Sequence, residues 1–129
     1  MAHMDAPDYP TVYLADDGII RLDYGPNALI DLDMAKKAVA RSSALITAPT
    51  PILLRGARAM NTTGEAEEYL NGPAGSTLCS ALALLMTSNS ARLAVNLYHR
   101  MRPVPYPTRA FLEEAEALDW LKSHMAPAK

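Results

Sequence analysis

The chain has 129 residues, of which 50% are hydrophobic and 20% are charged, and its formal net charge is -2. This length fits one domain with a real core, and the charge predicts neither a nucleic-acid-binding nor a membrane-binding surface. The single cysteine, Cys79, excludes an intrachain disulfide and a multi-cysteine metal site. No apolar run approaches the roughly 18 residues that a membrane helix needs, so we expect a cytoplasmic protein without a membrane span.

The domain is expected to cover residues 11–125. Residues 1–10 precede it, because Met1-Ala2-His3-Met4 is typical of a cloning remnant and the two prolines that follow indicate a flexible lead-in. Residues 126–129 are expected to form a flexible tail. The sequence shows no internal repeat.

A β-hairpin and a helix are the first elements that the sequence predicts. Val12–Leu14 and Ile19–Tyr24 are rich in β-forming residues and are separated by an Asp-Gly turn, which is a strong hairpin signal. Gly25-Pro26-Asn27 is predicted to end the second strand. Asp31 is predicted to cap a helix that runs to about residue 46.

A short buried strand and a second helix follow. Ile52–Leu54 is an apolar run after two prolines and predicts a buried strand, which Gly56 is expected to end. Thr62 is followed three residues later by Glu65, which indicates a capping box at the start of a helix over residues 63–71.

The last third of the chain predicts two strands and two helices. Residues 78–86 form the most apolar run and predict a central strand. The next helix is expected to end at Met101, with Leu93, Leu97 and Met101 on its buried side. A strand over 108–112 and a helix over 113–124 complete the domain. Together the elements predict an α/β fold with a mostly parallel five-stranded sheet, one antiparallel edge strand and about four helices.

The sequence around residue 61 resembles that of a known family. Leu53-Leu54, a loop and Ala59-Met60-Asn61-Thr62-Thr63-Gly64 are similar to the strand, loop and Asp-Ser-Ser-Gly helix start of the STAS domain (sulfate transporter and anti-sigma factor antagonist). Residues 103–121 look more like the divergent SpoIIAA-like or STAS/SEC14-like small bacterial proteins. The resemblance implies a regulatory protein-binding module without a cofactor, whose partner is an anti-sigma-like or kinase-like protein.

The resemblance also implies site residues. In antagonists of that family the second hydroxyl residue of the motif is phosphorylated, which makes Thr63 the phosphoacceptor candidate. Asn61, Thr62, Gly64 and Arg58 would surround it on the partner-binding surface. The sequence departs from the family pattern at Arg55, where antagonists carry an acidic residue, and at Asn61, which replaces an aspartate. Helix capping alone also explains both threonines.

A second hypothesis belongs to a different class of protein. Aromatic residues and methionines are numerous enough in the second half of the chain to line an apolar pocket between the sheet and the helices. Its polar contacts would come from Tyr98, Arg100, Tyr106 and Arg109, and the protein would be a small-ligand binder or a cofactorless enzyme. His99 is expected at the surface.

Motifs of known enzymes are missing from the sequence. It carries no nucleophile elbow, phosphate-binding loop, dinucleotide fingerprint or zinc-protease motif, so we predict no catalytic residue, metal ligand or cofactor. The regulatory module and the ligand binder both stay open, as does a homodimer.

Overall fold

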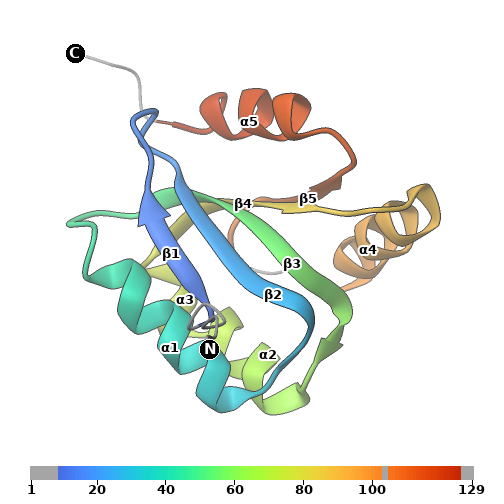
Figure 1. Cartoon of the computed structure of the whole chain (residues 1–129), viewed down its shortest axis with the longest axis horizontal. Coiled ribbons are helices and arrows are strands. Elements are labelled where there is room, and N and C mark those ends of the chain that lie inside the picture. Colours follow the sequence, from blue (N-terminus) through green and yellow to red (C-terminus); the bar gives the residue numbers. More distant parts are fainter. Residues whose placement is uncertain (1–8, 103–104, 126–129) are drawn as a thin grey trace, which may run out of the picture.

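The computed structural model describes residues 9–102 and 105–125, without the side chains of residues 26–28 and 56–61. It has a five-stranded sheet with the spatial order β1-β2-β3-β4-β5, in which β1 is antiparallel to β2 and the other strands are parallel (Figure 1). The predicted α/β class, the hairpin and the mostly parallel sheet are therefore confirmed. The elements in chain order are β1 (Thr11–Leu14), β2 (Ile20–Ile30), α1 (Leu32–Ser43), β3 (Thr50–Thr62), α2 (Gly64–Asn71), α3 (Pro73–Ser76), β4 (Cys79–Leu85), α4 (Asn89–Met101), β5 (Thr108–Phe111) and α5 (Glu114–Lys122).

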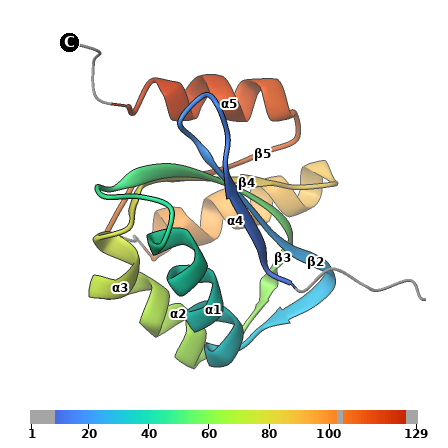
Figure 2. The ribbon, with the colours of Figure 1, turned by 60° about the vertical axis from the view of Figure 1, so that its left-hand side comes forward.

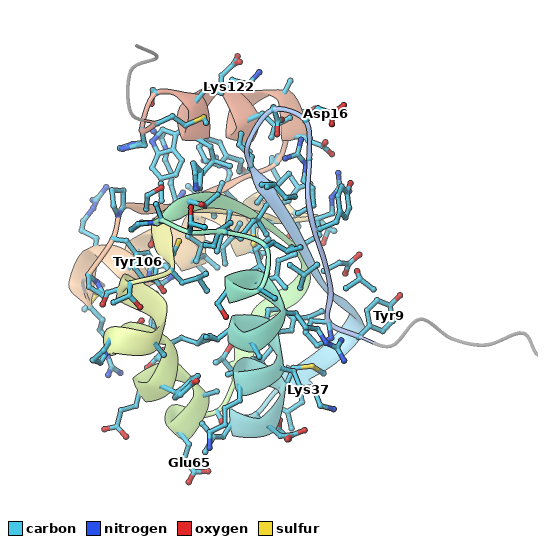
Figure 3. All side chains as sticks on the ribbon, turned by 90° about the vertical axis from the view of Figure 1, so that its left-hand side faces the viewer. Tyr9, Asp16, Lys37, Glu65, Tyr106 and Lys122 are labelled. Atoms are coloured by element: carbon cyan, nitrogen blue, oxygen red, sulfur yellow. The ribbon has the colours of Figure 1, made fainter. Side chains whose placement is uncertain are left out.

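The helices divide unequally between the two faces of the sheet. Strands β2 to β5 are spatial neighbours in chain order, so right-handed crossovers place α1, α2 with α3, and α4 on one face. Helix α5 follows the last strand and covers the opposite face alone (Figure 2). The tip of the β1–β2 hairpin, marked by Asp16, lies beside α5 (Figure 3).

Strand β2 is longer than predicted. Gly25-Pro26-Asn27 does not end it, because Gly25 adopts a φ of +89° and the ladder to β3 continues after a shift in register between Asp23 and Ala28. A β-bulge absorbs a residue whose conformation a regular strand excludes. The Tyr9 ring lies so close to Gly25 that an added Cβ would fall 2.8 Å from it.

Strand β3 is also longer, and the prediction that Gly56 ends it is wrong. The strand runs to Thr62, because pairing with β2 on one side extends as far as Ile30 and Thr62. The N-cap of α2 is Thr63 rather than Thr62, and its hydroxyl accepts from the Ala66 N–H at 3.2 Å. The predicted capping box of Thr62 and Glu65 is therefore wrong, because the residue three positions after the Thr63 cap is Ala66, which has no side-chain acceptor to complete a box.

The face of helix α4 that is buried against the sheet differs from the face that its apolar residues predict. Leu93, Leu97 and Met101 are 54%, 54% and 73% exposed, whereas Val95 is 2% exposed. The orientation is consistent with the neighbouring Asn96, whose amide donates to the Ala110 carbonyl and accepts from the Ala110 N–H. Asn96 thus pairs with the backbone of edge strand β5 and fixes which side of α4 is buried.

Candidate functional site

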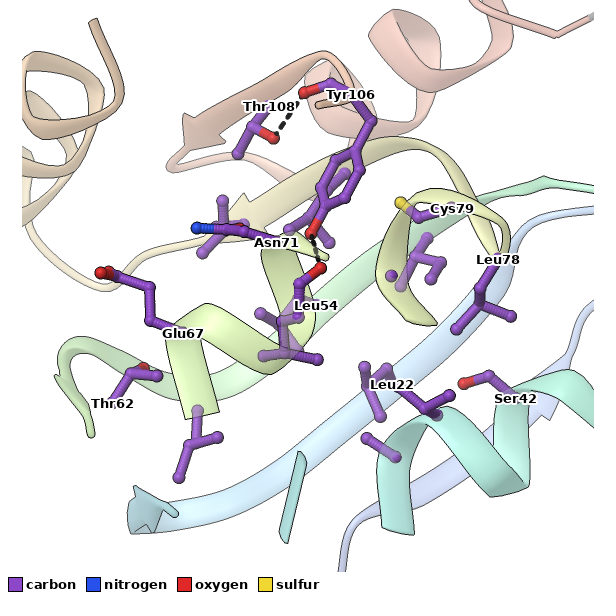
Figure 4. Close-up of a pocket in the computed structure, with 18 of the residues that line it drawn as sticks. Leu22, Ser42, Leu54, Thr62, Glu67, Asn71, Leu78, Cys79, Tyr106 and Thr108 are labelled. Carbon is purple, nitrogen blue, oxygen red and sulfur yellow. Dashed lines mark hydrogen bonds between the residues drawn. The ribbon is translucent and has the colours of Figure 1, made fainter. Parts of the chain in front are cut away.

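A cavity of about 130 Å³ lies between the sheet and the helices α1, α2 and α4 (Figure 4). Strands β2, β3 and β4 supply its apolar floor. Helix α1 contributes Val39 and the two small residues Ala38 and Ser42. The wall comprises Leu22, Tyr24, Ile30, Ala38, Val39, Ser42, Ile52, Leu54, Thr62, Glu67, Leu70, Asn71, Gly75, Leu78, Cys79, Leu82, Leu84, Tyr98, His99, Tyr106 and Thr108.

A local irregularity of strand β4 brings Cys79 to this cavity. Leu82 and Leu84 lie on the cavity face, whereas Ala81 and Ala83 lie on the α5 face, so strict alternation would place Cys79 with the alanines. The register against β3 shifts between the pairs Thr50–Cys79 and Pro51–Ala81. This shift turns the Cys79 thiol to the same side as the leucines.

Three weakly acidic side chains of the wall stay protonated at neutral pH. Burial raises the pKa of the Cys79 thiol to about 12, and it also raises the pKa of Tyr24 and of Tyr106. The Tyr106 ring enters the cavity and its hydroxyl donates to the Leu70 carbonyl at 3.4 Å (Figure 4). This part of the wall is therefore polar in places but uncharged.

Two polar atoms of the wall have no hydrogen-bond partner among the described residues. They are the Oγ of Ser42, a residue that is 0% exposed, and the Nδ1 of His99, and both are buried. Burial lowers the pKa of His99, and the nearby Glu67 opposes this to a smaller degree. The imidazole is therefore neutral at pH 7. The expectation that His99 is a surface residue is wrong, because α4 turns it toward the sheet.

One polar cluster bridges α2 and α4 at the edge of the cavity. The Tyr98 hydroxyl donates to a Glu67 carboxylate oxygen at 2.5 Å, and the Arg102 guanidinium lies 3.7 Å from the other oxygen. The hydrogen bond to Glu67 is the main reason that the pKa of Tyr98 is raised. Glu67, Asn71 and Tyr98 are all partly exposed, so the cavity reaches solvent on this side.

The structure brings together only some of the ligand contacts that the sequence proposed. Tyr98 and Tyr106 both line the cavity. Arg100 is exposed on α4 and is not part of the wall. Arg109 lies on the opposite face of β5, with its guanidinium 5.3 Å from the centre of the Phe111 ring, and that ring packs beside α5.

The residues of the proposed phosphorylation motif lie at the junction of β3 and α2. Thr63 is half-buried and caps α2, while Gly64 is exposed at the first turn and has nothing within 4 Å of an added Cβ. Thr62 lines the cavity. The side chains of Arg58 and Asn61 lie outside the described part of the structure. The divergent Arg55 forms an ion pair with Glu114 of α5.

Five wall residues that carry a titratable side chain or an unpartnered polar atom were not proposed from the sequence as site residues. Tyr24 could have been found, because it continues the alternation of Ile20 and Leu22 toward the same face. The other four are Ser42, Glu67, Cys79 and His99. Their sequence neighbourhoods resemble an ordinary helix face or strand, and only the packing of α1, α2 and α4 makes them neighbours of one space.

Residues 9–102 and 105–125 contain neither a metal centre nor a membrane span. No three histidine, cysteine, aspartate or glutamate side chains gather there in a way that could hold a metal ion. Within the same residues no helix combines the length and apolar character that crossing a membrane requires.

The fold and the cavity define a small α/β domain with an apolar interior site. A family model described as a domain of unknown function (DUF7793) matches residues 13–125, and the chain belongs to this family. A search of the curated proteins finds no match. A crystal structure of a protein with unknown function from Arthrobacter sp. FB24 is 27% identical, and the alignment covers 91% of this chain and 96% of that chain. Its TM-score of 0.32 is too low to support an argument from shared architecture.

Proposed function

We propose that the protein binds a small, mainly apolar molecule in the cavity beneath α1, α2 and α4. The observation that carries the proposal is the cavity itself, a space of about 130 Å³ whose wall is mostly apolar. The same wall favours a binding role over catalysis by a thiol nucleophile. Its thiol is held protonated by burial, so it is a poor nucleophile.

The energetic cost of an empty cavity supports this proposal. At about 24 cal/mol per Å³, an enclosed apolar space of this size would destabilise a folded protein by about 3 kcal/mol relative to a filled core, and by less where it reaches solvent, as it does beside Glu67 and Tyr98. That is a large share of the roughly 5–15 kcal/mol by which a domain is stable. A bound molecule would restore the missing contacts, so occupancy and stability would be coupled.

The volume limits the size of the ligand. An apolar cavity of about 150 Å³ accommodates benzene, so this one suits a single ring or a short branched chain. Larger ligands would have to extend outward past Glu67, Asn71 and Tyr98, where the wall is partly exposed.

Titration with single-ring compounds tests the proposal. We expect benzene or indole to shift the NMR signals of wall residues and to raise the melting temperature. Ala38→Leu fills the cavity and should abolish both effects, because Ala38 is 2% exposed and lines the wall. Ala40→Leu adds the same side chain at an exposed position of α1 and should leave both effects intact. Ligand shifts that survive in Ala38→Leu, or none in the wild type, would contradict the proposal.

A second candidate function is a protein-binding surface at the start of α2, switched by phosphorylation of Thr63. The observation that favours it is the open space around Gly64, since a partner could approach the first turn of α2 closely. This candidate keeps the role that the STAS resemblance implies. A phosphate on Thr63 would gain from the positive end of the helix dipole and would meet Glu65 and Glu67 in the same turn.

Intact mass after incubation with cell lysate and ATP tests this second candidate. We expect one added phosphate in the wild type and none in Thr63→Asn. Asparagine keeps the side-chain oxygen that caps α2, so it removes the phosphoacceptor without loss of the cap. A phosphate that persists in Thr63→Asn would place the modification elsewhere and refute the candidate.

A further inference from the structure

The unpartnered polar atoms of the cavity wall point to the chemical class of the ligand. We infer that the cavity selects an uncharged molecule that carries a hydroxyl group, an alcohol or a phenol, over a plain hydrocarbon and over a carboxylate. The inference rests on the proposed function and specifies it. Its basis is the pair of buried atoms, Ser42 Oγ and His99 Nδ1, that line the same space without a partner.

Ser42 differs from its neighbour on α1. The Ser43 hydroxyl is exposed and donates to the Ala40 carbonyl of its own helix at 3.2 Å, which is a common arrangement for helical serine. The Ser42 hydroxyl makes no such bond, although the residue is 0% exposed. Figure 4 shows its oxygen turned toward Leu22, on the cavity side of the helix. A buried hydroxyl in this position is free to bind a polar group in the cavity.

His99 of helix α4 offers the second hydrogen-bonding atom. Its imidazole is neutral at pH 7 because burial lowers its pKa, so Nδ1 accepts or donates one hydrogen bond according to its tautomer. A ligand hydroxyl both donates and accepts, which suits a serine hydroxyl and a neutral imidazole equally. An apolar ring without a polar group would leave both atoms unpaired.

Charge at the cavity wall opposes a carboxylate ligand. Among the described side chains the wall has no lysine or arginine, and Glu67 is the only carboxylate among them. Glu67 would repel an anion, and it is already bound to Tyr98 and Arg102. A buried anion without a cationic partner pays a large desolvation cost, so a neutral ligand is favoured.

Parallel NMR titrations with benzene, phenol and benzoate test the inference. We expect phenol to bind about five- to tenfold more tightly than benzene, as one added buried hydrogen bond would provide, and benzoate to bind more weakly than either. Ser42→Ala and His99→Phe remove the two unpartnered atoms one at a time. At least one of them should abolish the preference for phenol, and benzene binding should persist in Ser42→Ala. Ser43→Ala on the same helix is the matched control and should keep the wild-type preference.

The outcomes separate this inference from the proposed function. Equal affinity for benzene and phenol, or a preference for phenol that survives in both variants, would overturn the inference and leave ligand binding intact. Tighter binding of benzoate would also overturn it. No binding of any of the three rings would remove the proposed function and the inference with it.

Discussion

The two faces of the sheet are packed in different ways. On the α5 face seven of the described residues form a buried cluster under one helix, namely Ile19, Leu53, Ala81, Ala83, Phe111, Ala117 and Leu121. On the opposite face the helices α1, α2, α3 and α4 cover a larger cluster, and a cavity of about 130 Å³ remains within it. The same strands serve both faces, so the difference comes from the side chains and the helices that meet them.

Residue size gives a physical reason for this difference. On the α5 face the cluster combines small residues of the sheet and the helix, Ala81, Ala83 and Ala117, with the large Leu53 and Leu121. Such a mixture of sizes allows close packing. On the other face, small residues of α1 lie over the space between strand side chains. One sheet can therefore carry a buried core cluster on one face and, on the other, a cavity that has room for a ligand.

Removing a large buried side chain should lower the free energy of unfolding most on the α5 face. Leu121→Ala is expected to lower the free energy of unfolding by about 4 kcal/mol, because the residue is 0% exposed. Leu84→Ala removes the same atoms from the cavity wall and should cost nearer 2–3 kcal/mol, since part of its surface already lacks neighbours. Urea unfolding measures both changes. A Leu84→Ala variant that loses more stability than Leu121→Ala would contradict the difference in packing between the two faces.

Adding a large side chain should also destabilise the protein more on the α5 face than on the cavity face. Ala81→Leu is expected to lower the free energy of unfolding by about 1–3 kcal/mol, because Ala81 is 0% exposed on the α5 face. Ala38→Leu adds the same atoms where space exists, so it should cost less than about 1 kcal/mol or stabilise the protein. Thermal unfolding of the two variants, without added ligand, measures both changes in stability. Equal destabilisation by both would mean that the cavity cannot accept a side chain.

The smallest effect is expected in the pH dependence of stability. The pKa of His99 is lowered in the folded protein, so the unfolded chain takes up this proton at higher pH, near 6.5. Between the two pKa values the unfolded state binds more protons, and His99 therefore makes the protein less stable as the pH falls below about 6.5.

His99→Phe should make the free energy of unfolding decrease less between about pH 7 and pH 5. Leu97→Phe introduces the same ring at an exposed position of α4 and should keep the wild-type slope. Urea titrations at several pH values compare the slopes. An unchanged slope in His99→Phe would mean that His99 is protonated equally in both states.

The order of the elements could be predicted from the sequence because local signals mark each of them. The Asp-Gly turn, the cap at Asp31 and the apolar run 78–86 indicate a hairpin, a helix and a buried strand without reference to the rest of the chain. Strand ends were harder to place. Gly25 and Gly56 normally end strands, but pairing with a neighbouring strand extends β2 and β3 beyond them.

The cavity could be predicted only in part. Tyr98 and Tyr106 were proposed as ligand contacts because of their type, and they line the space. Arg100 was proposed on the same grounds but lies outside the wall, since the pairing of Asn96 with β5 sets the rotation of α4. That pairing joins residues 14 positions apart, and no local pattern reveals it.

The sequence by itself determined the class of fold, because hydrophobic periodicity and turn residues act over a few neighbouring positions. The tertiary structure alone decided which residues share the cavity and which polar atoms remain without a partner there. The physical reason is that a cavity is a property of the space between elements. It depends on how closely helices from distant parts of the chain approach one sheet, and on a register shift that turns Cys79 inward.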